Sequence, residues 1–260
     1  MSTNTAPYGA TLDVSQTPQV PMARLIKVEL RKMLDTRSGM WLMITIAGLT
    51  VLICTLLGIF GHSQDRTFFN FMIAAGTPQG FLLPVLGILL VTQEWSQRTG
   101  MVTFSLEPHR SRILSAKVFA ALLVGVAAFA IALVVAFLTT TVFGGPDPYR
   151  DFGGIDTLKF GILQVTGILQ GLAIGLLLLN SAAAIVIYFV VPLAFSILFN
   201  VVPTLEKSAP WVDFGTAQGP LQDSGALSGT EWAHLAVTGT IWVILPFLAG
   251  LWRVLRAEVK

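Results

Sequence analysis

Long apolar runs alternate with short polar segments along most of the chain. Six of these runs approach or exceed the roughly 20 residues that a helix needs to cross the hydrocarbon core of a bilayer. They cover about Trp41 to Gly61, Phe71 to Thr92, Arg112 to Phe143, Phe160 to Leu179, Ile185 to Val202 and Leu235 to Trp252. The pattern predicts an all-α integral membrane protein with six transmembrane helices.

The second run is interrupted by helix-breaking residues. These are Gly76, Pro78, Gly80 and Pro84. Since proline removes a backbone donor and clashes with the preceding turn, we expect either a kink or a late helix start near Phe81.

A short basic segment precedes the first run. Between Met22 and Leu34, apolar residues recur at helical i, i+3, i+4 spacing. Arg24, Lys27, Arg31 and Lys32 populate the other side. This segment is too short to span a bilayer, so it predicts an amphipathic helix lying in the membrane interface. The alternative is a cytoplasmic extension of the first span.

The longest polar stretch, Pro203 to His234, contains aromatic residues that a fully solvated loop would not need. Trp211, Phe214 and Trp232 lie there among glycines, prolines and acids. We expect short re-entrant helices that dip into the outer interface. Ser228 and Glu231 have the spacing of a capping box just before the last span.

Composition supports the membrane assignment. Of 260 residues, 54% are hydrophobic and only 12% are charged, about half the charged fraction of soluble domains. The net charge of +2 gives no reason to expect a nucleic-acid partner. The single Cys54 excludes a disulfide framework or a cysteine metal cluster. Residues 1–21, polar and proline-containing, are predicted to be a disordered cytoplasmic tail before a membrane domain over 22–260.

Cations are distributed unequally between the two faces that six spans would define. Twelve Lys and Arg residues fall on the face that holds both termini and the segment Gln93 to Lys117, against four on the other face. Because basic loops stay on the cytoplasmic side, both termini and this segment are predicted to be cytoplasmic, in the plasma membrane.

The sequence carries no motif for chemistry of its own. It has no GxxxxGK[ST] phosphate loop and no HExxH, CxxC or GxSxG pattern. His62, His109 and His234 fall in three separate loops, so a shared metal site is not expected. No acid or base lies in the apolar cores of the runs, which argues against an ion-coupled carrier and a membrane-embedded lipid enzyme. We therefore expect neither enzyme activity nor a bound cofactor.

A glycine repeat in the fourth run is a candidate for close helix packing. Gly167, Gly171 and Gly175 repeat every four residues, a small-residue ridge that lets another helix approach closely. The contact would form within the subunit or across a dimer.

Three polar residues lie in or next to the same run. Gln164, Gln170 and Asn180 could line a pathway or could simply bond across helices. The sequence favours neither alternative.

A family resemblance rests on the segment Gln93 to Lys117, QEWSQRTGMVTFSLEPHRSRILSAK. Its pattern includes a Glu ending the second span, Arg-Thr-Gly, and then Pro, Arg and Lys entering the third span. Together with the start ELRKMLDTRSG, the six spans and the long outer loop, it resembles the ABC-2 type ABC transporter permeases over residues 22–260. The chain has Met101 and Val102 where a small residue or Thr-Leu is common. The matching positions are Glu94, Arg98, Thr99, Gly100, Pro108, Arg110 and Lys117.

The resemblance implies a transmembrane subunit of an ATP-driven exporter. Two permease subunits, identical or different, would assemble with a pair of ABC ATPase subunits that bind ATP, and a lipophilic drug, antibiotic, peptide or lipid would be exported. Met22 to Leu34 would be the connecting helix, and Ser96 to Leu106 would hold a coupling helix that docks on the ATPase. The coupling-loop residues would be Glu94, Arg98, Thr99, Gly100, Met101, Val102, Phe104 and Leu106.

The residues of that loop give a physical reason for docking. Apolar side chains beside Arg98 and Glu107 suit insertion into a partner's groove, although they could instead pack under the bundle or touch lipid. A different hypothesis is a non-transporting membrane anchor or sensor that recruits a cytoplasmic protein. ATP-dependent substrate flux would distinguish the two.

Overall fold

The computed structural model describes residues 19–97, 109–150 and 152–256, and every regular element in these ranges is helical. Six long apolar helices could each cross a membrane, and a shorter helix precedes them, which confirms the predicted all-α, six-span class. The spans are α2, α3, α5, α6, α7 and the continuous stretch from α10 through η3 to α11. In chain order the elements are α1 (Met22–Asp35), α2 (Arg37–Phe60), α3 (Phe68–Ser96), α5 (Arg110–Phe143), α6 (Gly154–Leu178), α7 (Ser181–Val201), η1 (Pro203–Ser208), α8 (Ala209–Val212), α9 (Phe214–Gln218), η2 (Gly219–Gln222), α10 (Gly229–Gly239), η3 (Thr240–Ile244) and α11 (Leu245–Arg256).

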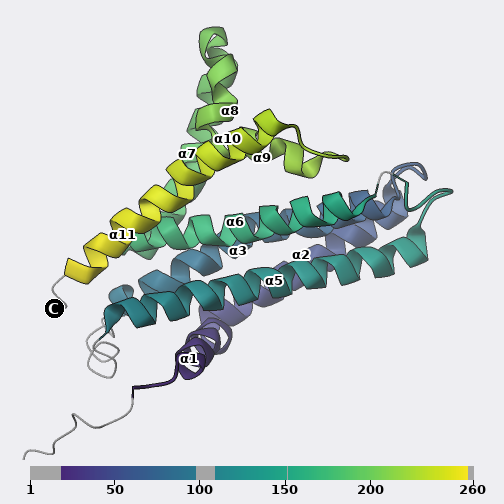
Figure 1. The fold of residues 1–260 in the computed structure, drawn as a ribbon. Helices are drawn as coiled ribbons and strands as arrows, with labels where there is room; N and C mark the ends of the chain where they lie inside the picture. Colours follow the sequence, from purple (N-terminus) through teal and green to yellow (C-terminus); the bar gives the residue numbers. More distant parts are fainter. Residues whose placement is uncertain (1–18, 98–108, 151, 257–260) are drawn as a thin grey trace, which may run out of the picture.

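Four helices form the bundle that carries most of the core. Helices α2, α3, α5 and α6 run alongside one another, and α3 contacts the other three (Figure 1). As a result, α3 is the most buried of the six spans. Two apolar clusters fill the bundle, one around Leu86 and Leu172 and the other around Phe71 and Phe160.

Glycines bring α3 and α6 into their closest contact. A Cβ added to Gly171 would lie 2.0 Å from the Pro84 carbonyl oxygen, and one added to Gly175 would lie 2.7 Å from the Val91 side chain. Gly87 faces the α6 backbone in the same way, at 2.4 Å. The predicted small-residue ridge therefore meets another helix of the same chain.

The predicted late start of the second span near Phe81 is wrong. Helix α3 begins at Phe68 and includes both of its prolines. Pro84 has no N–H to bond the Gly80 carbonyl one turn earlier, and the Tyr188 hydroxyl of α7 donates to that oxygen at 3.5 Å. The proline is tolerated because a neighbouring helix supplies a donor for the released carbonyl.

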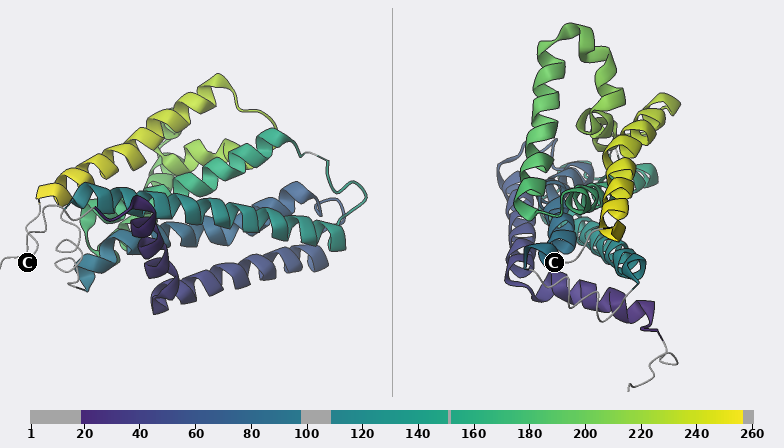
Figure 2. Two further views of the ribbon diagram at one scale, coloured as in Figure 1. Left: turned by 60° about the horizontal axis from the view of Figure 1, so that its bottom comes forward. Right: turned by 90° about the vertical axis from the view of Figure 1, so that its left-hand side faces the viewer.

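Helix α7 leaves the bundle. It projects across the direction of the other helices, and the segment after it turns back toward α10 (Figures 1 and 2). That segment contains η1, α8, α9 and η2, so the loop before the last span does form short helices. Their insertion into a membrane interface stays a prediction.

Several chain segments meet at one end of the bundle. Helix α1 crosses this end (Figure 2). Arg112 Nη1 in α5 donates to Gln19 Oε1, just before α1, at 2.8 Å. Arg110 Nη1 donates to the Val254 carbonyl of α11, also at 2.8 Å. Both ends of the described chain thus lie at the same end of the bundle, while the side of the membrane stays a prediction from the charge count.

Candidate functional site

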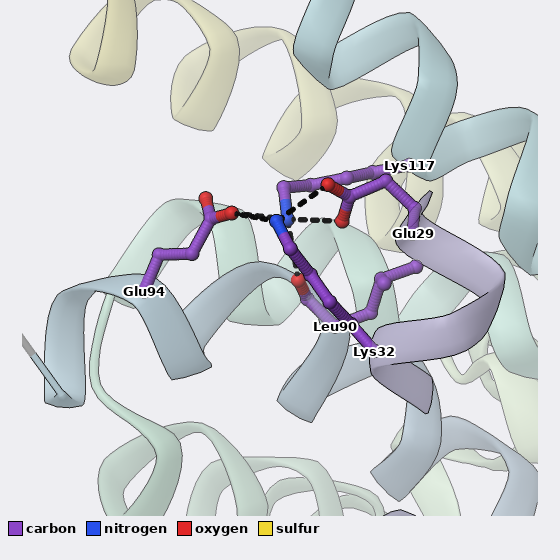
Figure 3. A network of polar contacts seen from close by, with 5 residues as sticks. All are labelled: Glu29, Lys32, Leu90, Glu94 and Lys117. Atoms are coloured by element: carbon purple, nitrogen blue, oxygen red, sulfur yellow. Dashed lines mark hydrogen bonds and ion pairs between the residues drawn. The ribbon is translucent and has the colours of Figure 1, made fainter. Parts of the chain in front are cut away.

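Four charged side chains join α1, α3 and α5 at this end of the bundle. Glu29 and Lys32 of α1, Glu94 of α3 and Lys117 of α5 form what is called here the charge cluster (Figure 3). Lys32 Nζ lies 2.7 Å from Glu29 Oε1 and 2.6 Å from Glu94 Oε1. Lys117 Nζ lies 2.6 Å from Glu29 Oε2 and 3.3 Å from Glu94 Oε1. Two ammonium groups and two carboxylates therefore balance in one compact network.

Burial makes each of these contacts necessary. Glu29, Glu94 and Lys117 are each at most 5% exposed. A further hydrogen bond, from Lys117 Nζ to the Leu90 carbonyl at 2.9 Å, contributes to satisfying the buried ammonium. Since an isolated buried charge is strongly unfavourable, the network holds together only as long as all of its members remain in place.

Lys32 is the most exposed member of the charge cluster. Burial lowers the pKa of its ammonium, but the Glu29 and Glu94 carboxylates outweigh that effect and raise the pKa above its ordinary value of 10.5. Lys32 is therefore protonated at neutral pH. Its contribution to stability is fully present below pH 10.5 and is lost only as the pH rises through the raised pKa.

The charge cluster brackets the predicted coupling loop. Glu94 lies near the end of α3, just before the predicted loop, and Lys117 lies in the second turn of α5, just after it. Both are fastened to α1. Of the predicted loop residues, the structure describes only Glu94. The others lie outside the described residues, namely Arg98, Thr99, Gly100, Met101, Val102, Phe104 and Leu106.

Sequence reasoning missed the charge cluster because it treated these residues as solvated. The second apolar run ends at Thr92, so Glu94 was assigned to the polar segment although it belongs to α3. Lys117 falls within the predicted third run, but it was counted among the cations of the polar segment. The helices that form the spans thus carry acids and bases near their ends, outside the apolar cores of the runs. A signal was present in α1, where Glu29 falls on the apolar face of the helix, between Leu25 and Ile26 on one side and Met33 on the other.

A cavity of about 820 Å³ lies between α3, α6 and α7. Residues 213–225, called here the roof segment, close one side of it through α9 and η2. Most of its wall is apolar or aromatic. The lining side chains include Ile73, Thr77 and Phe81 of α3, Phe160, Leu163 and Gln170 of α6, Tyr188, Phe189 and Leu193 of α7, Asp213, Phe214 and Gln218 of the roof segment, and Trp242 of η3.

The three polar candidates of the fourth run have different positions. Gln170 lines the cavity. Gln164 is buried, and its Nε2 donates to Gln79 Oε1 of α3 at 2.9 Å. Asn180 precedes α7 and accepts a hydrogen bond from the Ala183 N–H at 3.0 Å, which makes it a helix cap. Only Gln170 is therefore available to a molecule in the cavity.

A buried ion pair fastens the roof segment to α6. Lys159 precedes the predicted fourth run, Phe160 to Leu179, but α6 begins at Gly154 and Lys159 is almost fully buried. Its ammonium lies 3.1 Å from Asp156 Oδ1 and donates to the carbonyls of Asp223 and, at 2.6 Å, Gly225. Asp156 Oδ1 also accepts the Gly225 N–H at 3.0 Å. These bonds hold the roof segment in place at its C-terminal end.

Two further hydrogen bonds hold the rest of this region. Gln218 Nε2 donates to Thr166 Oγ1 of α6 at 3.0 Å, and Trp242 Nε1 donates to the Val212 carbonyl at 2.7 Å. Within the described ranges, no group of three or more His, Cys, Asp or Glu residues could hold a metal ion.

The chain matches no protein-family model, and no curated protein matches it. The ABC-2 type resemblance thus stays a hypothesis from the residues quoted for it.

Proposed function

We propose that the chain is the transmembrane permease subunit of an ATP-driven exporter of the ABC-2 type. A separate pair of ATPase subunits would bind and hydrolyse ATP and would dock on the loop between the second and third spans. The observation that carries this proposal is the charge cluster, which binds both helices flanking that loop to α1.

A transporter driven by a separate ATPase subunit needs a stiff connection between the loop that contacts the ATPase and the membrane spans. In the charge cluster, Glu94 binds Lys32 of α1 and Lys117 binds Glu29 of α1, so α1 and the loop-proximal ends of α3 and α5 would move as one body. A displacement of the loop would then be transmitted along α3 to the cavity. A flexible connection would absorb that displacement instead.

The cavity supports a cargo of mainly apolar character. Its volume lies within the roughly 300–1,000 Å³ of typical small-molecule pockets, and aromatic side chains form much of its wall. A lipophilic drug, antibiotic, peptide segment or lipid matches such a lining.

The second permease subunit is proposed from the family resemblance and from the exposed apolar surface of α7. A second permease subunit, identical or different, would cover part of the apolar surface that α7 leaves exposed. The charge count supports a position in the plasma membrane with both termini in the cytoplasm.

Substitutions in the loop test this function. In proteoliposomes that contain the chain and its ATPase partner, Met101→Asp and Phe104→Asp should leave membrane insertion and ATP hydrolysis intact but abolish most ATP-driven flux. A charged side chain at either position would prevent the apolar contact with the ATPase. The matched control is Ser105→Asp, which adds the same charge at a polar position. Normal flux at normal ATPase coupling in both variants would refute docking through this loop.

A further inference from the structure

We propose that Asp213 in the cavity wall is the binding partner for a positively charged group, and that the cavity takes a lipophilic cation. This inference rests on the proposed export function for its biological meaning, but the site itself is defined by the geometry around Asp213.

Asp213 is a buried carboxylate with one oxygen in use. It is only 5% exposed, and it caps α9. Its Oδ2 accepts hydrogen bonds from the Thr216 N–H at 2.9 Å and from Thr216 Oγ1 at 2.6 Å. Its Oδ1 accepts no hydrogen bond from the described part of the chain, and no Lys, Arg or His there forms an ion pair with Asp213. Capping α9 therefore leaves one carboxylate oxygen for a ligand.

The charges around the cavity favour a cation. Among the described residues that line it, Asp213 is the sole acid and no Lys, Arg or His is present. A carboxylate removed from water without a counter-ion is costly, and a bound cation would offset that cost. An anion in the same cavity would meet repulsion with no compensating group.

The remaining wall matches the rest of such a molecule. Aromatic rings of Phe189, Phe214 and Trp242 line the cavity, and aromatic faces attract cations as well as apolar groups. At its rim, Phe81 and Leu193 are 58% and 61% exposed on α3 and α7. An amphiphile dissolved in the bilayer would thus reach the cavity between these two helices. The geometry defines a lipophilic amine, quaternary ammonium or phosphonium as the ligand class.

Direct binding tests the site without any transport assay. The full chain is placed in nanodiscs of phosphatidylcholine, and binding of tetraphenylphosphonium is compared with that of tetraphenylborate, a matched anion. Empty nanodiscs correct for partition into lipid. We expect the wild-type chain to bind the cation and to bind the anion at least about tenfold more weakly.

Variants of the roof segment identify the responsible group. Asp213→Asn keeps an oxygen that can cap α9 and should weaken cation binding about tenfold or more, whereas Asp213→Glu should retain most of it. The control Glu206→Gln removes an exposed carboxylate of η1 and should leave binding unchanged. Unfolding temperatures of all variants establish that each is folded.

Three results would overturn the proposal: no cation binding by the wild-type chain, equal binding of the two ions, or unchanged cation binding in Asp213→Asn. Cation binding in a chain that never supports ATP-driven flux would leave this site standing and refute the export function. ATP-driven flux together with unchanged cation binding in Asp213→Asn would refute this site and leave the export function standing.

Discussion

At the scale of single residues, the charge cluster is favourable only while all four of its charges are present. A buried ion pair is a weak source of stability in itself, because desolvation consumes most of the Coulomb attraction. Removing one partner is a different matter, since it leaves an uncompensated charge in the interior. The paired arrangement of Glu29, Lys32, Glu94 and Lys117 is therefore sensitive to any single neutral replacement.

We predict that Lys117→Met destabilises the folded chain by about 3–5 kcal/mol. The variant leaves the Glu29 and Glu94 carboxylates buried with only the partly exposed Lys32 between them. Thermal unfolding in detergent would measure the loss. Lys27→Met, an exposed replacement on α1, should change stability little. Equal stability of the two variants would contradict an energetic role for the charge cluster.

The α3–α6 contact gives a second prediction. Gly171→Ala should destabilise the chain by about 1–3 kcal/mol, because its Cβ would collide with the Pro84 carbonyl at 2.0 Å and backbone cannot yield cheaply. Gly167→Ala is the matched control, since its Cβ would meet Pro84 at an ordinary 3.7 Å. The measurement is again thermal unfolding. A tolerated Ala at Gly171, or a larger Leu there with unchanged assembly, would refute the close contact.

At the scale of elements, apolar runs predicted the spans well and their ends poorly. Hydrophobicity reports where a helix touches lipid or core, whereas a helix continues wherever backbone hydrogen bonds continue. Glu94 and Lys159 therefore lie inside helices that are longer than the apolar runs that predicted them. Contacts such as Lys32 with Glu94 and Glu29 with Lys117 join elements distant in sequence, and no local pattern encodes that pairing.

The cavity was beyond sequence reasoning for a similar reason. Gln170 was a candidate pathway residue from its position in an apolar run, but the sequence could not separate it from Gln164, which bonds to another helix. Asp213 gave no signal, because an acid in a long loop is ordinarily solvated. It becomes notable only when the roof segment folds over the cavity.

The roof segment itself can be tested as an element. We predict that Lys159→Met speeds hydrogen exchange of backbone amides in residues 213–225 about tenfold or more, the equivalent of roughly 1.4 kcal/mol. The variant removes the ammonium that binds Asp156 and two roof carbonyls. Lys207→Met, at an exposed position on η1, is the control and should leave exchange in the roof segment unchanged.

If exchange in the roof segment is the same in both lysine variants, Lys159 does not fasten it. Faster exchange throughout the bundle would also contradict the prediction, since it would mean that Lys159 supports the whole fold and not the roof segment in particular.

At the scale of the whole molecule, the chain combines a tightly packed bundle with a loosely packed side. Helices α2, α3, α5 and α6 share a core, while α7 projects from them with much of its apolar surface exposed (Figure 1). The charge cluster joins α3 and α5 of the packed part to α1. The cavity lies where the packed part meets α7, so relative motion of the two would open or close it.

Flux through a complex isolated by way of this chain tests the central claim most directly. The chain is tagged, purified from its native membrane with whatever subunits it holds, and reconstituted into vesicles with a lipophilic fluorescent cargo. The account predicts that an ATPase carrying a phosphate-binding loop co-purifies and that cargo moves only when ATP is hydrolysed. A chain that purifies without an ATPase, or a complex that hydrolyses ATP and moves no cargo, would contradict it and favour a membrane anchor or sensor.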